Sequence, residues 1–205
     1  MTATYDLEQI KKNLEKHFFH TMIMERKEEV IHWFQTEFPQ VKTVGRGGSV
    51  TLDQLNISQI LRDRGMTVYY HGEASQEERR QVMEKAMFSD IYLSSVNALL
   101  ADGSLFNVDG NGNRVAALIF GPQEAIYVVG KNKIVANLTE AEERLKTIAS
   151  PQNVARLQYP AGCLKTGRCI DCNSPKRICN AYTLLKRAPW AVKSTVILVN
   201  EDLGY

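Results

Sequence analysis

The stretch that decides the fold is residues 91–133, IYLSSVNALLADGSLFNVDGNGNRVAALIFGPQEAIYVVGKNK. It opens with a short apolar run at residues 91–93 and closes with a second one at residues 125–129. Both runs are rich in β-branched or aromatic residues and are bounded by turn formers, so we expect each to be a buried strand. Between them, Asp, Asn and Gly residues cluster over residues 97–114, and the apolar segment 115–120 that follows could begin a helix.

The cluster at residues 97–114 has two interpretations. Glycines let backbone N–H groups approach a ligand, while a helix N-terminus and the nearby Arg114 would favour a negative charge, so together they indicate an anion site. The alternative is a long turn-rich connection that contains two hairpins with Asn-Gly or Asp-Gly turns. The composition of the segment is compatible with both.

Strands and helices are expected to alternate on either side of this stretch. Short apolar runs predict further strands at residues 18–24, 41–44, 66–70 and 196–199. Helical periodicity predicts helices from Leu7, with Asp6 as N-cap, and at residues 30–38, 58–64, 76–88 and 139–148, after which Pro151 ends the pattern. Capping boxes are expected at Thr51 with Gln54, Ser75 with Glu78, and Thr139 with Glu142. This order predicts one α/β domain over residues 1–205 with a largely parallel sheet.

Open parallel sheets bind ligands outside the carboxyl ends of their strands. Four polar or glycine-rich segments follow predicted strands in this chain: residues 45–51, 97–114, 131–133 and 200–202. We therefore expect these segments to converge on one edge of the sheet. The first of them, Gly45-Arg46-Gly47-Gly48-Ser49-Val50-Thr51, has neither the lysine of a Walker loop nor the spacing of the dinucleotide fingerprint.

Charge and hydropathy argue against two classes of protein. The chain has 25 basic and 23 acidic residues, a formal net charge of +2, and both signs are scattered, so it has no basic stripe of the kind that nucleic-acid-binding proteins carry. No segment approaches the roughly 18 apolar residues of a membrane span. Residues 1–6 have neither the basic nor the apolar region of a signal peptide. We therefore expect a cytoplasmic protein that has no membrane span.

All four cysteines lie in one segment, residues 160–182. Cys163, Cys169, Cys172 and Cys179 are separated by five, two and six residues. Four soft ligands at this spacing can complete a tetrahedral zinc site or hold a four-iron cluster, although the spacing is not that of the bacterial ferredoxin run. The alternative is a loop of free or reversibly paired thiols, because a Cys-x-x-Cys pair can also cycle as a redox dithiol.

Four motifs, in order, resemble those of the lactate-utilisation (LUD) domain family. They are Gly47-Gly48-Ser49-Val50-Thr51-Leu52, the run from Ser95-Val96-Asn97-Ala98 to Asp102-Gly103, Asp109-Gly110-Asn111-Gly112-Asn113-Arg114-Val115-Ala116, and Gly130-Lys131-Asn132-Lys133-Ile134. The resemblance covers nearly the whole chain. It implies a Rossmann-like three-layer α/β/α domain, similar to ribose-phosphate isomerases and CoA transferases, and a role like that of the small subunit of the bacterial L-lactate oxidation system. In that wider fold, the segment from Asp102-Gly103 to Arg114 belongs to the substrate-binding edge.

The resemblance implies no catalytic residue, because the acidic residues of the sugar isomerases and the glutamate nucleophile of the CoA transferases have no clear counterpart here. Many LUD domains also lack the four cysteines. Between the two metals we favour an iron–sulfur cluster over zinc, because L-lactate oxidation in the resembling system passes electrons through iron–sulfur proteins. Such proteins would then be the partners of this chain.

The leading hypothesis is a LUD-type protein that serves oxidation of L-lactate or a similar small 2-hydroxy acid, with a cysteine-ligated metal centre. Arg114 and Lys133 would contact the carboxylate or phosphate of a small anionic ligand. One alternative is an isomerase or acyl-transferase that acts on a sugar phosphate or CoA ester, with Asp102, Asp109 or Glu201 as acid–base. Another is a non-catalytic redox or metal sensor. The expected ligand-binding residues are Gly47, Gly48, Ser49, Asn97, Asp102, Gly103, Asp109, Gly110, Gly112, Asn113, Arg114 and Lys133.

Overall fold

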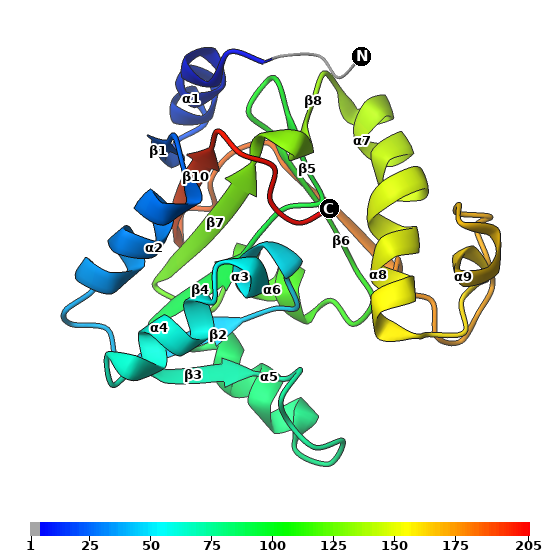
Figure 1. Cartoon of the computed structure of the whole chain (residues 1–205), viewed down its shortest axis with the longest axis horizontal. Helices are drawn as coiled ribbons and strands as arrows, with labels where there is room; N and C mark the ends of the chain where they lie inside the picture. The colour runs from blue at the N-terminus through cyan, green and yellow to red at the C-terminus, as the bar shows by residue number, and fades with distance from the viewer. Residues whose placement is uncertain (1–4) are drawn as a thin grey trace.

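A six-stranded sheet forms the centre of the computed structural model, which describes residues 5–205 (Figure 1). Every pair of neighbouring strands in it is parallel. The sheet confirms the expected strands. In spatial order they are β1 (His20–Met24), β10 (Lys193–Val199), β7 (Glu124–Gly130), β4 (Ile91–Ser94), β2 (Thr43–Arg46) and β3 (Thr67–Tyr70).

The sheet is covered on both faces, which explains why its central strands are apolar without alternation. Successive residues of β7 point to opposite sides, so Ile126 and Val128 belong to one buried cluster whereas Tyr127 and Val129 belong to another. These four residues are at most 1% exposed. The chain therefore has a core on each side of the sheet.

Three helices pack on the first face: α2 (Lys27–Thr36), α3 (Val50–Gln54) and α4 (Ile57–Asp63), which are neighbours in Figure 1. They contribute Phe34, Leu52 and Leu61, all with no exposed surface, to the core on that side. The capping box expected at Thr51 and Gln54 is wrong, because the helix begins earlier. Ser49 is the N-cap of α3, and its Oγ accepts a hydrogen bond from the Leu52 N–H at 3.4 Å.

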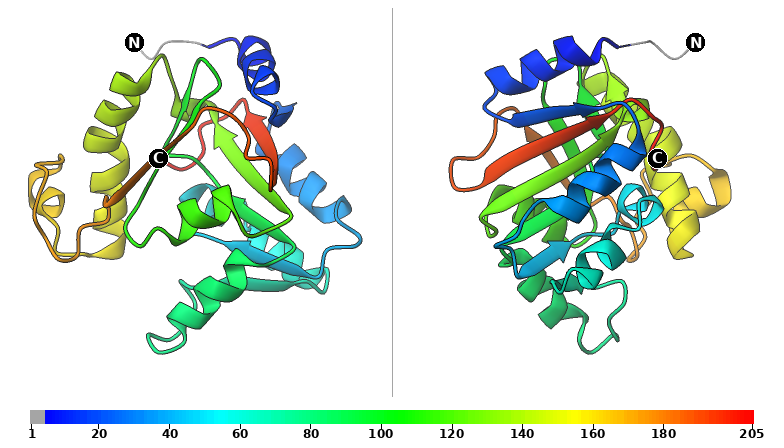
Figure 2. Two further views of the ribbon diagram at one scale, coloured as in Figure 1. Left: turned by 180° about the vertical axis from the view of Figure 1, so that it is seen from behind. Right: turned by 60° about the vertical axis from the view of Figure 1, so that its left-hand side comes forward.

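The second face carries α1 (Leu7–Lys16), α5 (Arg79–Met87) and α6 (Asn113–Ile119). Seen from behind in Figure 2, α5 and α6 lie toward the viewer. Asp6 caps α1 as predicted, since its side chain accepts from the Glu8 N–H at 3.0 Å. Ser75 Oγ accepts from the Glu78 N–H at 3.3 Å, but α5 begins only at Arg79.

A second, four-stranded sheet lies beyond this face and was not predicted. Its order is β8 (Ile134–Val135), β5 (Ala98–Leu100), β6 (Leu105–Asp109) and β9 (Ala181–Leu185). A helical column covers it, made of α7 (Leu138–Arg144), a π-helical turn (Leu145–Ala149) and α8 (Ser150–Leu157), on the side of the molecule opposite α2 (Figure 1). The short helix α9 (Gly162–Thr166) follows.

Two expectations for this column are wrong. Asn137 is the N-cap of α7, because its side chain accepts from the Glu140 N–H at 3.1 Å, so Thr139 and Glu142 do not form the cap. Pro151 does not end the helical pattern, because it stands in the first turn of α8 directly after the π-helical turn. Proline is tolerated in a first turn, where its missing N–H would have no helical partner.

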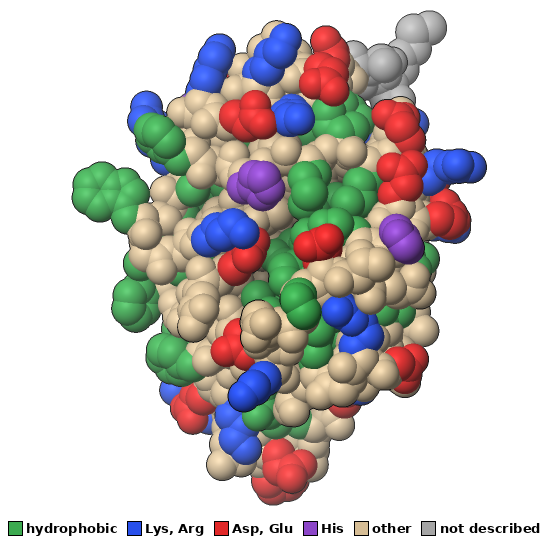
Figure 3. All heavy atoms as spheres, turned by 90° about the vertical axis from the view of Figure 1, so that its left-hand side faces the viewer, with side chains coloured by type: hydrophobic (Ala, Val, Ile, Leu, Met, Phe, Trp, Pro, Cys, Tyr) green, Lys and Arg blue, Asp and Glu red, His purple; other side chains and the backbone are tan. Residues whose placement is uncertain are grey.

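The exposed surface mixes both signs of charge. Figure 3 shows basic and acidic side chains interspersed over one face, with hydrophobic side chains protruding along one edge. Trp190 is fully exposed in the segment before β10. Within residues 5–205, no helix is both long enough and apolar enough to span a bilayer. Residues 1–4, which form part of the segment examined for a signal peptide, lie outside the described residues.

Candidate functional site

A cleft of about 550 Å³ opens at the carboxyl edge of the six-stranded sheet, where the resemblance and the strand order both placed the ligand site. The segments that follow β2, β3, β4 and β7 contribute to its lining, as do α8 and the segment after α9. It lies along the seam between the two sheets, because Ser95 and Asn97 follow β4 while Val108 and Asp109 end β6.

The charge of the lining is strongly positive. Among the described residues, six lysine or arginine side chains line the cleft, and Asp109 supplies the single carboxylate. A cleft lined by one sign of charge focuses the potential and attracts ligands of the opposite sign. The six basic residues are Arg79, Arg114, Lys133, Arg156, Lys176 and Arg177.

Arg114 is held entirely within the protein. Its Nε donates to Asp109 Oδ1 at 3.1 Å, and its Nη groups donate to the side-chain oxygens of Asn97 and Asn107 at 2.9 and 2.8 Å. They also donate to the carbonyl oxygens of Ser95 and Val108 at 3.2 and 2.8 Å. All five N–H donors of a guanidinium are thereby used. Its side chain is 11% exposed, so Arg114 forms the floor of the cleft and ties β4, β6 and α6 together.

Asp109 is also engaged on both of its oxygens. Its Oδ2 accepts from the backbone N–H groups of Arg114 and Val115 at 2.9 and 3.1 Å, which fixes the first turn of α6. The other two carboxylates considered for acid–base chemistry lie elsewhere. Asp102 is exposed on the turn between β5 and β6, and Glu201 is absent from the lining of the cleft. Among the described lining residues, therefore, no carboxylate is free.

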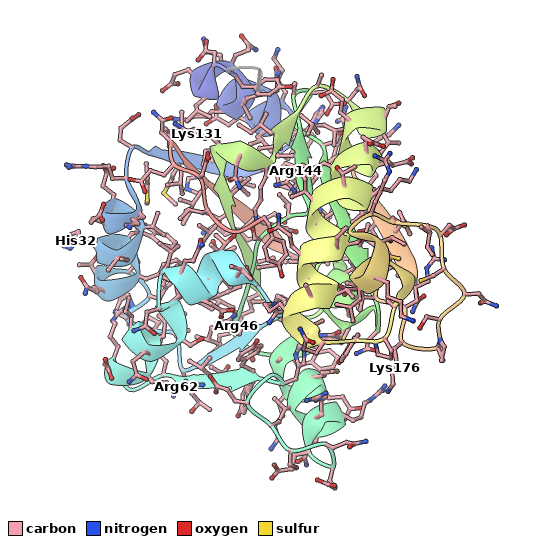
Figure 4. The ribbon with its side chains drawn as sticks, turned by 45° about the vertical axis from the view of Figure 1, so that its right-hand side comes forward. His32, Arg46, Arg62, Lys131, Arg144 and Lys176 are labelled. Carbon is pink, nitrogen blue, oxygen red and sulfur yellow. The ribbon has the colours of Figure 1, made fainter. Side chains whose placement is uncertain are left out.

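Arg46 binds the glycine-rich segment at residues 45–51 from its buried side, because its side chain donates to the carbonyl oxygens of Gly47 and Ser49 at 3.1 and 3.3 Å. It is 3% exposed, its Nη groups donate to Ser58 Oγ and Asp53 Oδ1 at 2.9 and 2.6 Å, and its guanidinium lies 4.1 Å from the centre of the Tyr70 ring. Figure 4 shows Arg46 near the middle of the molecule and Lys176 on the cysteine segment. Gly47 is required for close packing, because a Cβ there would lie 3.0 Å from the Cδ of Arg114.

Lys133 is buried beneath the cleft. It is 3% exposed, and its Nζ donates to Thr51 Oγ1 at 2.8 Å and to Ser95 Oγ at 2.9 Å. Burial holds the pKa of this amine well below its ordinary value, and the positive charges of Arg144 and Arg114 lower it further. Arg144 itself is bound to the carbonyl oxygens of Asn132 and Asn97, and burial lowers its pKa to about 10.

His71 and Arg79 provide further signs of a positive potential. Burial lowers the pKa of His71, and among the nearby charges that of Arg79 lowers it most. His71 Nδ1 and Arg79 Nε are both buried and have no hydrogen-bond partner in the described part of the chain. Such donors and acceptors can pair with a ligand, because a buried polar group that stays unpaired is costly.

The cysteine segment forms one wall of the cleft. Pro175, Lys176, Arg177, Ile178 and Asn180 line it, and they lie between Cys172 and Cys179 or directly after it. The Arg177 side chain donates to the carbonyl oxygens of Cys172 and Cys179 at 3.1 and 3.0 Å. The two features that the sequence singled out, the anion edge and the cysteines, are therefore neighbours.

The four thiols are not assembled into a ligand set. All are free, and no group of three or more His, Cys, Asp or Glu side chains within residues 5–205 is placed to hold a metal ion. Cys163 packs with Cys172 beside α8, whereas Cys179 packs against the second sheet. The thiols do lie close enough to one another to interact electrostatically. Burial raises the pKa of Cys163 and Cys179, and the charges of Cys169 and Cys172 raise both pKa values further. Metal binding at these cysteines stays a prediction.

Most of the residues predicted for the ligand site do line the cleft. Gly47 lies directly behind it against Arg114, and Gly112 caps α6 on the side of a neighbouring hollow. Asp102 and Gly103 are outside it, because they form the turn of the β5–β6 hairpin, where Gly103 packs against the backbone of Asn13. The predicted residues that line the cleft are Gly48, Ser49, Asn97, Asp109, Gly110, Asn113, Arg114 and Lys133.

Several lining residues escaped the sequence analysis. His71 follows β3, so the rule that placed the other segments at the carboxyl edge could have found it. Asn153 and Arg156 come from α8, a helix that Pro151 was expected to prevent. Tyr205 reaches the cleft from beyond β10, and its hydroxyl donates to Asn153 Oδ1 at 2.9 Å.

Comparison with known proteins gives a family and a fold. The model of a family described as the LUD domain matches residues 7–199. A solved structure described as a DUF162 family protein from Deinococcus radiodurans is similar with a TM-score of 0.51 and 13% sequence identity, over 95% of this chain and 96% of that one. At this identity the likeness concerns the fold alone. The search of curated proteins returned no match.

Proposed function

This chain belongs to the LUD domain family, and from that premise we propose that it binds a small anionic ligand in the cleft and serves the oxidation of L-lactate or a similar small 2-hydroxy acid in the cytoplasm. The family is associated with lactate utilisation. The observation that carries the proposal is the lining, in which six basic side chains stand against one carboxylate that Arg114 already neutralises. A 2-hydroxy acid offers a carboxylate to such a lining.

Two adjacent arginines on α5 provide the test. Arg79 lines the cleft and has a buried, unpaired Nε, whereas Arg80 is 86% exposed at its side chain and pairs with Glu84. We expect Arg79→Ala to weaken L-lactate binding about tenfold or more in calorimetric titration, since a hydrogen bond to a charged group contributes about 1.5–3 kcal/mol. Arg80→Ala is the matched control and should bind as the wild type does. Equal affinity in both variants would remove Arg79 from the site.

A larger anion is the second candidate, and the volume of the cleft favours it. About 550 Å³ lies within the range of pockets that hold drug-sized ligands, well beyond what a three-carbon acid fills. A sugar phosphate or a CoA ester would fill more of it. Titration with ribose 5-phosphate and acetyl-CoA beside L-lactate distinguishes the two candidates. Turnover of either larger compound by the purified protein would favour an isomerase or acyl-transferase.

We also propose that Cys163, Cys169, Cys172 and Cys179 bind a metal centre, either an iron–sulfur cluster or zinc. The support is chemical: four free thiols lie on one segment within electrostatic range, beside the positive Arg177. Binding would require the four thiols to approach one another, because Cys163 and Cys172 pack beside α8 whereas Cys179 packs against the second sheet. An iron–sulfur cluster would supply electron transfer at the wall of the cleft and point to iron–sulfur partner proteins, whereas zinc would only fix the segment.

Metal content and the visible spectrum of protein purified without oxygen test this proposal. Iron with broad visible absorption, lost in Cys172→Ser, would support a cluster. Stoichiometric zinc without colour would support a structural site. Protein without metal, even after reconstitution with either one, would overturn the metal centre and favour a thiol-based sensor.

A further inference from the structure

The buried amine of Lys133 has no acidic partner. Lysine is almost never fully buried unless it is paired, because removing an ammonium ion from water is costly. Lys133 is 3% exposed, yet both of its hydrogen-bond partners are hydroxyl groups, and no described carboxylate forms an ion pair with it. The charges that act on it are those of Arg144 on α7 and Arg114 on α6, and both are positive. No described carboxylate therefore offsets the charge of an ammonium ion at this position.

The hydrogen bonds fit a neutral amine. Thr51 Oγ1 lies 3.2 Å from the Leu203 carbonyl oxygen, so its hydroxyl can donate there and accept from Lys133. Ser95 Oγ accepts the second N–H of Nζ. A neutral amine has two N–H groups and one lone pair, and the two hydroxyls occupy both N–H groups. The lone pair therefore remains available for attack on a carbon atom.

The position of the amine suits a reaction with an anionic carbonyl compound. Lys133 follows β7 in the 3₁₀ turn η1 (Lys131–Lys133) and lines the cleft among basic side chains. These side chains attract the carboxylate of a ligand, whereas an uncharged amine can react with its carbonyl group. A desolvated lysine near other cations is a known way to activate a nucleophilic amine.

We propose that Lys133 forms an imine with a small 2-oxo acid, and this inference rests on the proposed function, since a 2-oxo acid is the oxidised form of a 2-hydroxy acid. The lone pair of Nζ attacks the carbonyl carbon, and one of the two Nζ protons passes to the carbonyl oxygen to give a carbinolamine. Loss of the hydroxyl group and of the second Nζ proton then releases one water molecule and leaves a C=N bond. No oxidant or reductant takes part.

Thr51 and Ser95 act as positioning residues in this step. Their oxygens lie 2.8 and 2.9 Å from Nζ and fix the direction of its lone pair. The segment after β10 covers them from outside, because a Cβ on Gly204 would come within 2.5 Å of Thr51 Oγ1 and 3.2 Å of Nζ. The 2-oxo acid would therefore approach from the open side of the cleft.

The experiment is reductive trapping with pyruvate and cyanoborohydride at neutral pH, followed by intact mass and peptide mapping. We expect one added carboxyethyl group, located on Lys133. Lys131 is the matched control, because it is exposed in the same 3₁₀ turn and pairs only with Asn200. Labelling of Lys133 should exceed that of Lys131 by more than about tenfold, because an ordinary surface lysine is almost wholly protonated at neutral pH. Lys133→Met should lose the adduct and Lys131→Met should keep it.

Equal labelling of Lys133 and exposed lysines would overturn the inference, as would the absence of any adduct on Lys133. Calorimetric titration of the same protein with L-lactate and pyruvate, without reductant, separates this failure from that of the proposed function. Binding without trapping would support the proposed ligand cleft and reject the imine. The absence of both binding and trapping would reject the proposed function and the imine together. Mapping of the wild-type protein decides the outcome even where Lys133→Met does not fold.

Discussion

Replacement of Arg114 by alanine should lower the free energy of unfolding, because Arg114 holds the seam between the two sheets together. This loss of stability should outweigh any direct effect on ligand binding. The guanidinium makes five hydrogen bonds, and one of them belongs to the ion pair with Asp109. The side chains of Arg114 and Asp109 are each 11% exposed. Removing one partner of a buried ion pair costs about 3–5 kcal/mol, because the other charge is left without compensation. This is a large part of the roughly 5–15 kcal/mol that stabilises a typical domain.

Urea unfolding followed by circular dichroism measures this loss. With a slope of about 1–3 kcal/mol per molar urea, the midpoint for Arg114→Ala should fall by more than about 1 M. Arg156→Ala is the control, since Arg156 also lines the cleft but is exposed and bonds only to Asn153 and Tyr205. Its unfolding free energy should change by no more than about 0.5 kcal/mol. Wild-type stability of Arg114→Ala together with lost ligand binding would refute our reasoning and restore Arg114 as a direct ligand contact.

Three further predictions follow from particular contacts. Gly45→Ala should destabilise the protein by more than about 3 kcal/mol in urea unfolding, because its Cβ would lie 2.0 Å from the Ala86 carbonyl oxygen, whereas Gly65→Ala, with φ of +82° and open space, should cost only about 1 kcal/mol. A smaller loss for Gly45→Ala than for Gly65→Ala would contradict the close packing of α5 on β2. The pKa of Lys133 is lowered in the folded state, so the unfolded chain binds its proton first, and the stability of the wild type relative to Lys133→Met should fall as the pH drops from 10 toward neutrality. A constant difference over this range would show that Lys133 stays charged. Asp102→Ala should leave calorimetric ligand affinity unchanged and cost about 1 kcal/mol through the lost bond to the Ser104 N–H; weaker ligand binding would return Asp102 to the site.

The parallel sheet and its functional edge could be predicted because they depend on local patterns. Short apolar runs marked the strands of the main sheet, and the rule for carboxyl ends then brought Ser49, Asn97 and Lys133 to one cleft. That step needs no knowledge of side-chain contacts. It requires only that neighbouring strands be parallel, as they are.

The second sheet could not be predicted in the same way. Its strands have two to five residues, too few to show a period, and β8 and β9 pair with β5 and β6 from distant positions in the chain. The pairing of Ala98 with Phe106 and of Leu99 with Leu105 turns Asp102-Gly103 into a hairpin turn. The same composition in an open loop would have suited a ligand site. Only the tertiary pairing decides between the two interpretations.

The helix that supplies Asn153 and Arg156 was missed for a different reason. Proline breaks a helix by removing an N–H from the regular hydrogen-bond ladder. In this chain the π-helical turn at Leu145–Ala149 has already interrupted that ladder, so Pro151 falls in the first turn of α8 and removes nothing. The positions of Asn153 and Arg156 therefore depend on a local change of helix type, which no residue pattern in the sequence predicts.

The basic residues in and around the cleft divide by their contacts into two sets, which the sequence cannot separate. Arg46, Arg114 and Arg144 are bonded to protein oxygens and are buried or nearly so. They shape the seam, and the charges of Arg144 and Arg114 add to burial, the larger cause, in lowering the pKa of Lys133. Arg79 and Arg156 line the cleft: the buried Nε of Arg79 has no partner in the described part of the chain, and Arg156 bonds only to Asn153 and Tyr205. We therefore expect substitutions in the buried set to change stability and the pKa of Lys133, and substitutions in the peripheral set to change ligand affinity.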